Sequence, residues 1–251
     1  MSPNHSRTFT DANLIARRFE EALKYVGIEV QPNSELAAAL HMIKDAEARQ
    51  RKNAPPPETD AERLEVSRGL GVLHFAELLL VAYTRGPEAI RFLVPHLKLL
   101  NSGEPAQNVR KIGDQAANKI FEALVALACC KFATDVKVDH PDESMGDNPD
   151  ILFTINGVTW GIACKTPNGA SVESALNLIE GGSKQITQCP ATRGLIVLNA
   201  RNWLDLPRLW PLDGHENYND VRRVAWQGRW GADGEDLVRS PTRDPQKTAG
   251  R

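Results

Sequence analysis

An acid and a lysine stand at the two outer ends of a predicted β-hairpin in this chain. Asp150 precedes one run of β-branched and aromatic residues, and Lys165 ends the next. The two runs flank Asn156-Gly157, the dipeptide that most strongly predicts a two-residue type I′ turn. With these two residues as the loop, Asp150 lies opposite Ala163, and Lys165 shares the face of Ala163 because side chains alternate with period two. The pattern therefore predicts that an acid and a lysine converge at the open end of one hairpin.

A second acid, Glu122, is the last polar residue before the apolar run 123–130 of a predicted helix. Two interpretations stay open for it: a surface glutamate paired with Lys119 one turn earlier, or a carboxylate aimed into a cleft. Together with Asp150 it could hold Mg²⁺ or Mn²⁺, which prefer hard oxygen ligands and share phosphate oxygens. Such an ion acidifies an attacking water, and Lys165 could orient the nucleophile or stabilise the transition state. The chemistry that these residues predict is phosphodiester hydrolysis.

A purely structural interpretation of the same pair also stays open. Asp150 after a proline can simply end a loop, and a lysine on an edge strand protects a sheet against aggregation. Lys165 directly follows the apolar residues 161–164, where a lone surface charge has little structural use. Cys164 as a nucleophile is a further possibility, although no histidine lies near it in the sequence to activate it.

The elements that must position these residues are predicted from hydrophobic periodicity and from capping residues. Four N-terminal helices are expected at residues 11–26, 34–52, 60–84 and 87–100, with a Pro-rich linker near 53–59. A helix at 109–132, a strand at 135–138, the hairpin, a helix at 171–180 with another turn or two at 183–188 after Gly181-Gly182, and a strand at 194–199 follow. The last strand is continuously apolar, which is typical of a strand buried on both faces. We therefore expect an all-α N-terminal domain (1–104), an α/β domain with a mixed sheet flanked by helices (105–230) and a flexible tail (231–251).

Composition limits the classes of function. The chain has 251 residues and a formal net charge of -2, so nucleic-acid contacts would need a local basic patch. Its four cysteines form no C-x-x-C pair, which suggests neither a zinc site nor a disulfide framework and favours a cytoplasmic protein. The first residues lack the pattern of a signal peptide, and the apolar run 69–83, interrupted by His74 and Glu77, is expected to be too short to cross a membrane.

The order of these motifs resembles the PD-(D/E)xK nuclease superfamily, which has the restriction-endonuclease-like fold. The resembling features are a helix with a glutamate, Pro-Asp at a strand start, a hairpin, and a second strand that ends in Cys164-Lys165. By this resemblance Glu122 and Asp150 bind the metal, the backbone carbonyl of Cys164 completes the metal shell, and Lys165 is the catalytic lysine. The resemblance covers residues 109–206 and implies metal-dependent endonuclease cleavage of DNA with Mg²⁺ or Mn²⁺, in phage defence, restriction or repair.

Three further residues are expected to contact the nucleic acid. Gln185 is similar to a glutamine found in some branches of the superfamily, although Cys189 stands where a tyrosine often follows it. Lys184 and Lys119 are the expected basic contacts. The N-terminal helices carry more apolar residues than four helices need, which predicts packing against the second half, a partner protein or another copy of the chain.

Ala163 departs from the family pattern, because the superfamily places Asp or Glu at this position. An alanine methyl group can neither bind a metal nor accept a proton. Three explanations stay open: an engineered inactivating substitution, a natural loss of catalysis, or a carboxylate elsewhere, such as Asp147 or Glu173, that reaches the same place. The alternative function is therefore a catalytically silent nuclease-fold module that binds nucleic acid or assembles with a partner protein.

Overall fold

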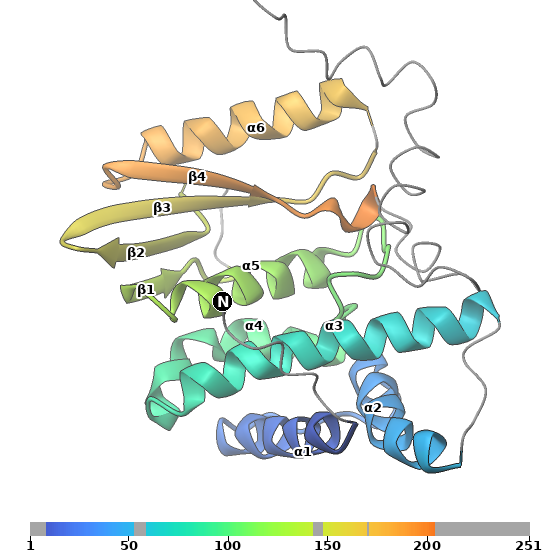
Figure 1. The fold of residues 1–251 in the computed structure, drawn as a ribbon. Helices are drawn as coiled ribbons and strands as arrows, with labels where there is room; N and C mark the ends of the chain where they lie inside the picture. Colours follow the sequence, from blue (N-terminus) through green and yellow to red (C-terminus); the bar gives the residue numbers. More distant parts are fainter. Residues whose placement is uncertain (1–8, 53–58, 143–147, 170, 204–251) are drawn as a thin grey trace, which may run out of the picture. The chain divides into compact units, whose positions relative to one another are not determined.

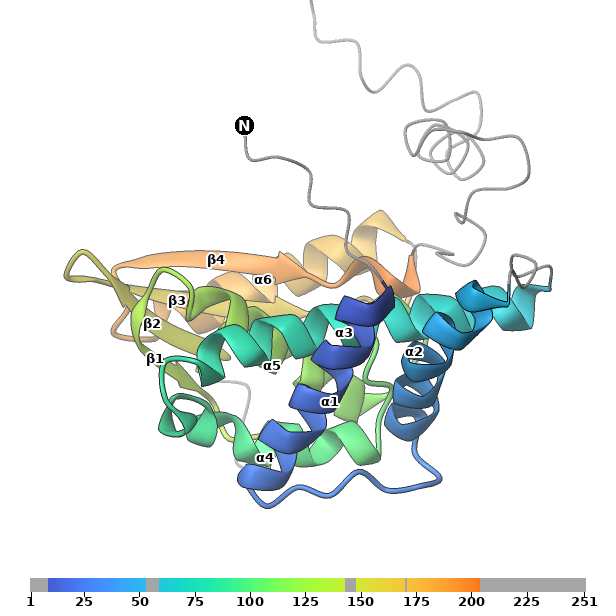
Figure 2. The same ribbon diagram turned by 60° about the horizontal axis from the view of Figure 1, so that its bottom comes forward.

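Three long α-helices begin the computed structural model, which describes residues 9–52, 59–142, 148–169 and 171–203 (Figure 1). They are α1 (Phe9–Tyr25), α2 (Glu35–Arg51) and α3 (Asp60–Tyr83), close to the predicted ranges. Capping explains their starts: the Ser34 hydroxyl accepts the Ala37 N–H at 3.1 Å, and Thr59 forms a reciprocal capping box with Glu62 at the start of α3. Figure 2 shows α1 crossing α3, with which it is in contact.

The helix α3 is the most apolar helix of the N-terminal part. By length and composition alone it could cross a membrane, a test that core helices of soluble proteins also pass. Phe75, Leu78 and Leu79 on this helix are buried, and α3 contacts α1, α2 and α5. Its apolar side chains therefore form the centre of the helical core.

The prediction of one continuous helix at 87–100 is wrong. The segment consists of a 3₁₀ helix η1 (Pro87–Leu93), a short α4 (Val94–Lys98) and a 3₁₀ turn η2 (Leu99–Asn101). Pro95 lies at the start of α4, where a proline has no N–H to continue the preceding turn and its ring restricts the residue before it. The segment still buries Ile90, Leu93, Leu97 and Leu100, as the apolar periodicity predicts.

The helix expected at 109–132 is shorter at both ends than predicted. α5 spans Gln115–Cys129, and the Asp114 side chain caps it by accepting the N–H of Ala117 at 2.9 Å. Gly113 has a φ of 78°, a conformation outside the right-handed helix. Lys111 and Ile112, which lie in the predicted helix, therefore precede the observed one.

The second half of the described chain is a four-stranded mixed sheet with a helix on each face (Figure 1). The strands β1 (Thr134–Val138), β2 (Ile151–Ile155), β3 (Val158–Lys165) and β4 (Arg193–Leu198) lie side by side in chain order. Neighbours β1–β2 and β2–β3 are antiparallel, and β3–β4 are parallel, joined by α6 (Val172–Thr187). The structure thus has six α-helices and one mixed sheet in its described residues, which confirms the α/β class.

The hairpin has the predicted register. Ile155 pairs with Val158 and Ile151 with Ile162, so the next pair outward is Asp150 with Ala163. Asn156 and Gly157 have φ values of 50° and 76°, the positive pair that a type I′ turn requires. The turn chemistry of two residues thus determined which side chains meet six residues away on each strand.

Two predictions about the last elements are wrong. α6 runs through Gly181-Gly182 without a break, because packing against β3 and β4 offsets the low helix propensity of the glycines. β4 is an edge strand of the described sheet instead of a strand buried on both faces, and Leu195 is 48% exposed. An apolar run alone does not distinguish a central strand from an edge strand.

One hydrophobic core joins the helices and the sheet. Its buried members run from Ala16 in α1 to Ile162 in β3, and all described residues belong to one structural unit, 1–207. A shared core is what the apolar surplus of the N-terminal helices predicts, whereas the expected domain boundary at residue 104 marks no break in this core. Residues 53–58, Asp147 and the tail 231–251 lie outside the described residues.

Candidate functional site

Asp150 lies at the start of β2, where the hairpin register places it. It is 5% exposed, and its Oδ2 accepts the backbone N–H of Cys164 on the neighbouring strand at 2.6 Å. Its own carbonyl accepts the N–H of Asp139 at 2.9 Å, which ties the start of β2 to the end of β1. The carboxyl group is therefore held rigidly between three strands.

Three other predicted site residues act electrostatically on this carboxyl group. Burial and, to a lesser degree, the negative charge of Glu122 raise the pKa of Asp150 to about 6. The hydrogen bond from Cys164 and the charges of Lys165 and Lys119 oppose the shift in this pKa. Residues from α5, β2 and β3 thus meet around one acid, as predicted for a two-carboxylate site.

Glu122 combines the two interpretations left open by the sequence. It is paired with Lys119, whose Nζ lies 2.9 and 3.0 Å from its two carboxylate oxygens. It is nevertheless 5% exposed and is not a surface residue. A buried carboxylate with one cation beside it and a second carboxyl group nearby is suited to receive a metal ion.

Lys165 is held by a residue of α6. Its Nζ donates to Oε1 of Gln185, and the Nε2 of Gln185 donates to the carbonyl of Asn148 at 3.1 Å. Gln185 is 6% exposed and lies on the face of α6 that meets the sheet. The glutamine therefore positions the lysine ammonium group and the segment that leads into Asp150.

The remaining predicted contacts lie away from this cluster or are already paired. Lys184 is exposed and pairs with Glu180 on the same helix at 2.8 Å. The thiol of Cys189 donates to the carbonyl of Ile186, and Glu173 is exposed in the first turn of α6. No contact in the described chain links these three residues to Asp150, so the geometry does not support Glu173 as the replacement carboxylate, and Lys184 stays a predicted nucleic-acid contact.

Cys164 contributes its backbone to the site. Burial raises the pKa of its thiol well above the ordinary value, and the charges of Asp150 and Glu122 raise it further. The thiol therefore stays protonated at neutral pH, which argues against the nucleophilic cysteine that the sequence leaves open.

Ala163, at the position where the resemblance predicts a carboxylate, is packed closely against α6. It is fully buried, and a Cβ added to Gly182 of α6 would lie 3.2 Å from the Ala163 Cβ. The same added atom would lie 3.3 Å from two carbons of Ile196. Alanine and glycine thus form a small pair that lets α6 approach the sheet closely.

The donor set limits what kind of ion fits. Within the described ranges, no three His, Cys, Asp or Glu side chains are grouped as in a protein-only metal cage. Mg²⁺ typically binds one or two carboxylates and takes its other ligands from water and substrate phosphates. Asp150 and Glu122, two buried acids of which one raises the pKa of the other, fit an ion of this kind.

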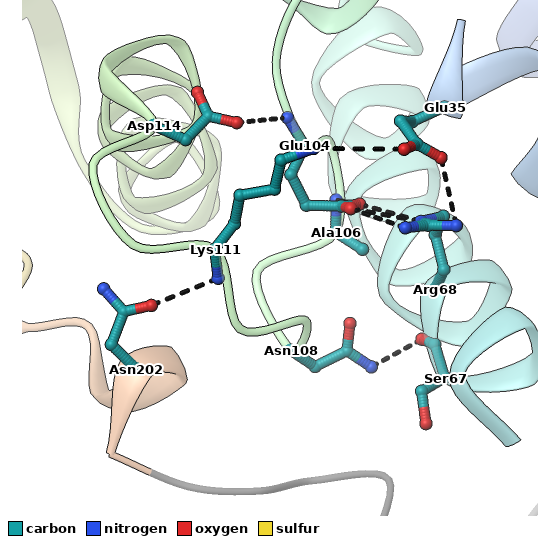
Figure 3. Close-up of polar contacts among 9 residues, drawn as sticks. All are labelled: Glu35, Ser67, Arg68, Glu104, Ala106, Asn108, Lys111, Asp114 and Asn202. Carbon is teal, nitrogen blue, oxygen red and sulfur yellow. Dashed lines mark hydrogen bonds and ion pairs between the residues drawn. The ribbon is translucent and has the colours of Figure 1, made fainter. Parts of the chain in front are cut away.

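A buried ionic network beside the site was not predicted (Figure 3). The guanidinium group of Arg68 on α3 forms a bidentate ion pair with the carboxylate of the fully buried Glu104, at 2.9 to 3.2 Å. Arg68 also forms an ion pair with Glu35 at 3.0 Å. Asp114 accepts the backbone N–H of Glu104 at 2.9 Å, so this network reaches the cap of α5. Arg68 and Glu104 are 36 residues apart, and no local sequence pattern links them.

His96 is the other residue near the site that was missed. It is 1% exposed on α4, and its Nε2 lies 3.6 Å from Oε2 of Glu122. Its neighbours Leu93, Leu97 and Leu100 on the same segment are buried. This group of apolar residues was the sequence feature that could have indicated a buried His96.

Removing the charge of Asp150 should change how stability depends on pH. A carboxyl pKa raised from 3.8 to about 6 means that the folded state retains a proton that the unfolded state loses. The free energy of unfolding should therefore fall by about 3 kcal/mol as pH rises from about 4 to about 6, and the loss should persist above this range. Asp150→Asn, whose amide oxygen still accepts the Cys164 N–H, should remove this loss and stabilise the protein by about that amount at pH 8.

The measurement is urea unfolding from pH 3.5 to 8. The exposed Asp142→Asn variant is the matched control and should leave the pH profile unchanged. If Asp150→Asn destabilises the protein at pH 8, the ionised Asp150 carboxylate does not destabilise the folded state, and the prediction is wrong.

Comparison of this chain with protein-family models, with curated proteins and with solved structures finds no match, so the case for its function is made by the site itself.

Proposed function

We propose that this chain is a metal-dependent nuclease with a restriction-endonuclease-like fold, which hydrolyses phosphodiester bonds of DNA. The observation that carries the proposal is that Glu122 and Lys165, from two other elements, both act on the buried carboxyl group of Asp150. The order of these elements, a helix with Glu122, a strand that starts at Asp150 and a hairpin strand that ends at Lys165, supports the fold assignment.

Each residue of the site has its own role in the proposed reaction. Asp150 and Glu122 would hold Mg²⁺ or Mn²⁺, with the carbonyl of Cys164 as a further ligand. The ion would lower the pKa of the attacking water and neutralise charge on the phosphodiester. Lys165 orients the nucleophile or stabilises the negative charge that develops in the transition state, and Gln185 keeps its ammonium group in place.

A second function, a catalytically silent module that binds nucleic acid, is favoured by one observation. Ala163 is fully buried against Gly182, so the alanine is part of a close helix–sheet contact and not a space left by a lost side chain.

Cleavage of supercoiled plasmid DNA with Mg²⁺ or Mn²⁺ distinguishes the two functions. The enzyme should nick DNA only with metal, and Lys165→Met should lower the rate about 100- to 1000-fold, as removal of one preorganised charge does. Lys24→Met is the control, because this exposed lysine in the last turn of α1 has no predicted role in the site. DNA binding without cleavage, unchanged by Lys165→Met, would instead support the silent module.

A further inference from the structure

His96 is a buried imidazole for which the proposed chemistry has no role. It is 1% exposed, and neither ring nitrogen has a hydrogen-bond partner among the residues that the structure describes. A buried polar group without a partner costs about 1 to 3 kcal/mol, so an apolar residue here would stabilise the core better. The cost suggests that the imidazole serves the site next to it.

The charged group that His96 faces is Glu122. The distance of 3.6 Å between Nε2 and Oε2 allows electrostatic attraction but is longer than a hydrogen bond. Polar contacts of catalytic groups are often long in unliganded structures and tighten when the ligand binds. Glu122 is therefore flanked by Lys119 from its own helix and by His96 from α4, which packs against α5.

The two flanking groups differ in rigidity. Lys119 has a long, flexible side chain that is 19% exposed, whereas the ring of His96 is enclosed by the helical core. Groups that hydrogen-bond a metal-binding carboxylate from behind fix its orientation, and their loss typically weakens metal affinity about 10- to 100-fold.

We propose that His96 is a positioning residue, which orients Glu122 for a divalent cation and thereby makes the N-terminal helices part of the site. The inference rests on the proposed function, since it requires that Glu122 binds the metal. It also assigns a role to the helical part, in which the sequence shows no chemistry.

Binding of Mn²⁺, measured by electron paramagnetic resonance with manganese chloride, tests this role without relying on cleavage. His96→Leu and His96→Phe should each weaken Mn²⁺ binding about 10- to 100-fold. His96→Gln, which keeps an N–H donor, should restore part of the affinity. Leu97→Val, a mild change of a buried neighbour on α4, should leave the affinity unchanged while it lowers stability.

A double-mutant cycle separates positioning from general packing. Because His96 acts through Glu122, His96→Leu should have no further effect on Mn²⁺ affinity when Glu122→Gln is already present. If either apolar variant folds and binds Mn²⁺ like the unmodified chain, or if the two effects simply add, the positioning role is wrong.

Different Mn²⁺-binding results would show that the proposed function itself is wrong. If the unmodified chain binds no Mn²⁺, or if Glu122→Gln leaves Mn²⁺ binding unchanged, the metal site and the role of His96 are refuted together. If Glu122→Gln weakens binding while the His96 variants do not, only the role of His96 is refuted.

Discussion

Ala163→Glu is expected to destabilise the folded chain by more than about 4 kcal/mol and not to raise the rate of DNA cleavage above that of the unmodified chain. Overpacking a filled core position costs about 1 to 3 kcal/mol, and a buried carboxylate without a partner costs several more. Ala163 is fully buried against Gly182, and its partner across the hairpin is the acid Asp150. A glutamate at this position would have to displace α6 and would repel a carboxyl group that burial already makes hard to ionise.

Urea unfolding and plasmid cleavage with Mg²⁺ are the two measurements. Leu195→Glu is the control, because Leu195 is 48% exposed on β4 and a glutamate there stays in water. A stable Ala163→Glu variant that cuts DNA faster than the unmodified chain would show that the site accepts the carboxylate and that Ala163 replaced it.

Arg201→Met is expected to destabilise the protein by about 3 kcal/mol, because several partly buried acceptors lose a charged donor. The Arg201 side chain is 2% exposed, and it donates to Gln107 at 3.1 Å, to Asn118 at 2.9 Å and to the carbonyl of Asp114 at 3.4 Å. Burial lowers the pKa of this guanidinium group, and the charges of Asp114 and Glu104 partly oppose the shift. The arginine lies in the 3₁₀ helix η3 (Ala200–Asn202) after β4 and ties it to the first turn of α5, one turn before Glu122.

The matched control is Arg193→Met, which removes an exposed arginine from β4 and should change the free energy of unfolding by less than about 0.5 kcal/mol. Arg201→Lys should rescue little of the loss, since one ammonium group cannot serve acceptors spread around a planar guanidinium group. Equal unfolding midpoints for Arg201→Met and Arg193→Met would show that the buried contacts contribute nothing.

The site that the sequence predicts depends on short-range chemistry. Asn156-Gly157 requires two positive φ angles, which selects the type I′ turn and places Asp150 opposite residue 163. Glu122 follows from its place on the predicted helix that became α5, whereas Gln185 was proposed only through the resemblance to the nuclease superfamily. The position of each residue within its own element could be predicted from the sequence, because it depends on one turn, one strand pair or a few helical turns.

Other features of the site depend on contacts between residues far apart in the sequence. His96 and Glu122 are 26 residues apart, and Arg201 and Gln107 are 94 apart. The exposed side of β4 and the unbroken path of α6 through Gly181-Gly182 likewise depend on which elements pack beside them. Local patterns carry no information about such partners.

Ala163 shows which properties of the site follow from the sequence and which follow only from the tertiary structure. Its register in the hairpin was determined by the sequence alone, because a two-residue turn leaves one alignment of the strands. The lack of space around it was decided by the tertiary structure, because Gly182 reaches it only after α6 packs across the sheet. The sequence thus determined which residue lies opposite Asp150, and only the packing of α6 decided that this position is buried.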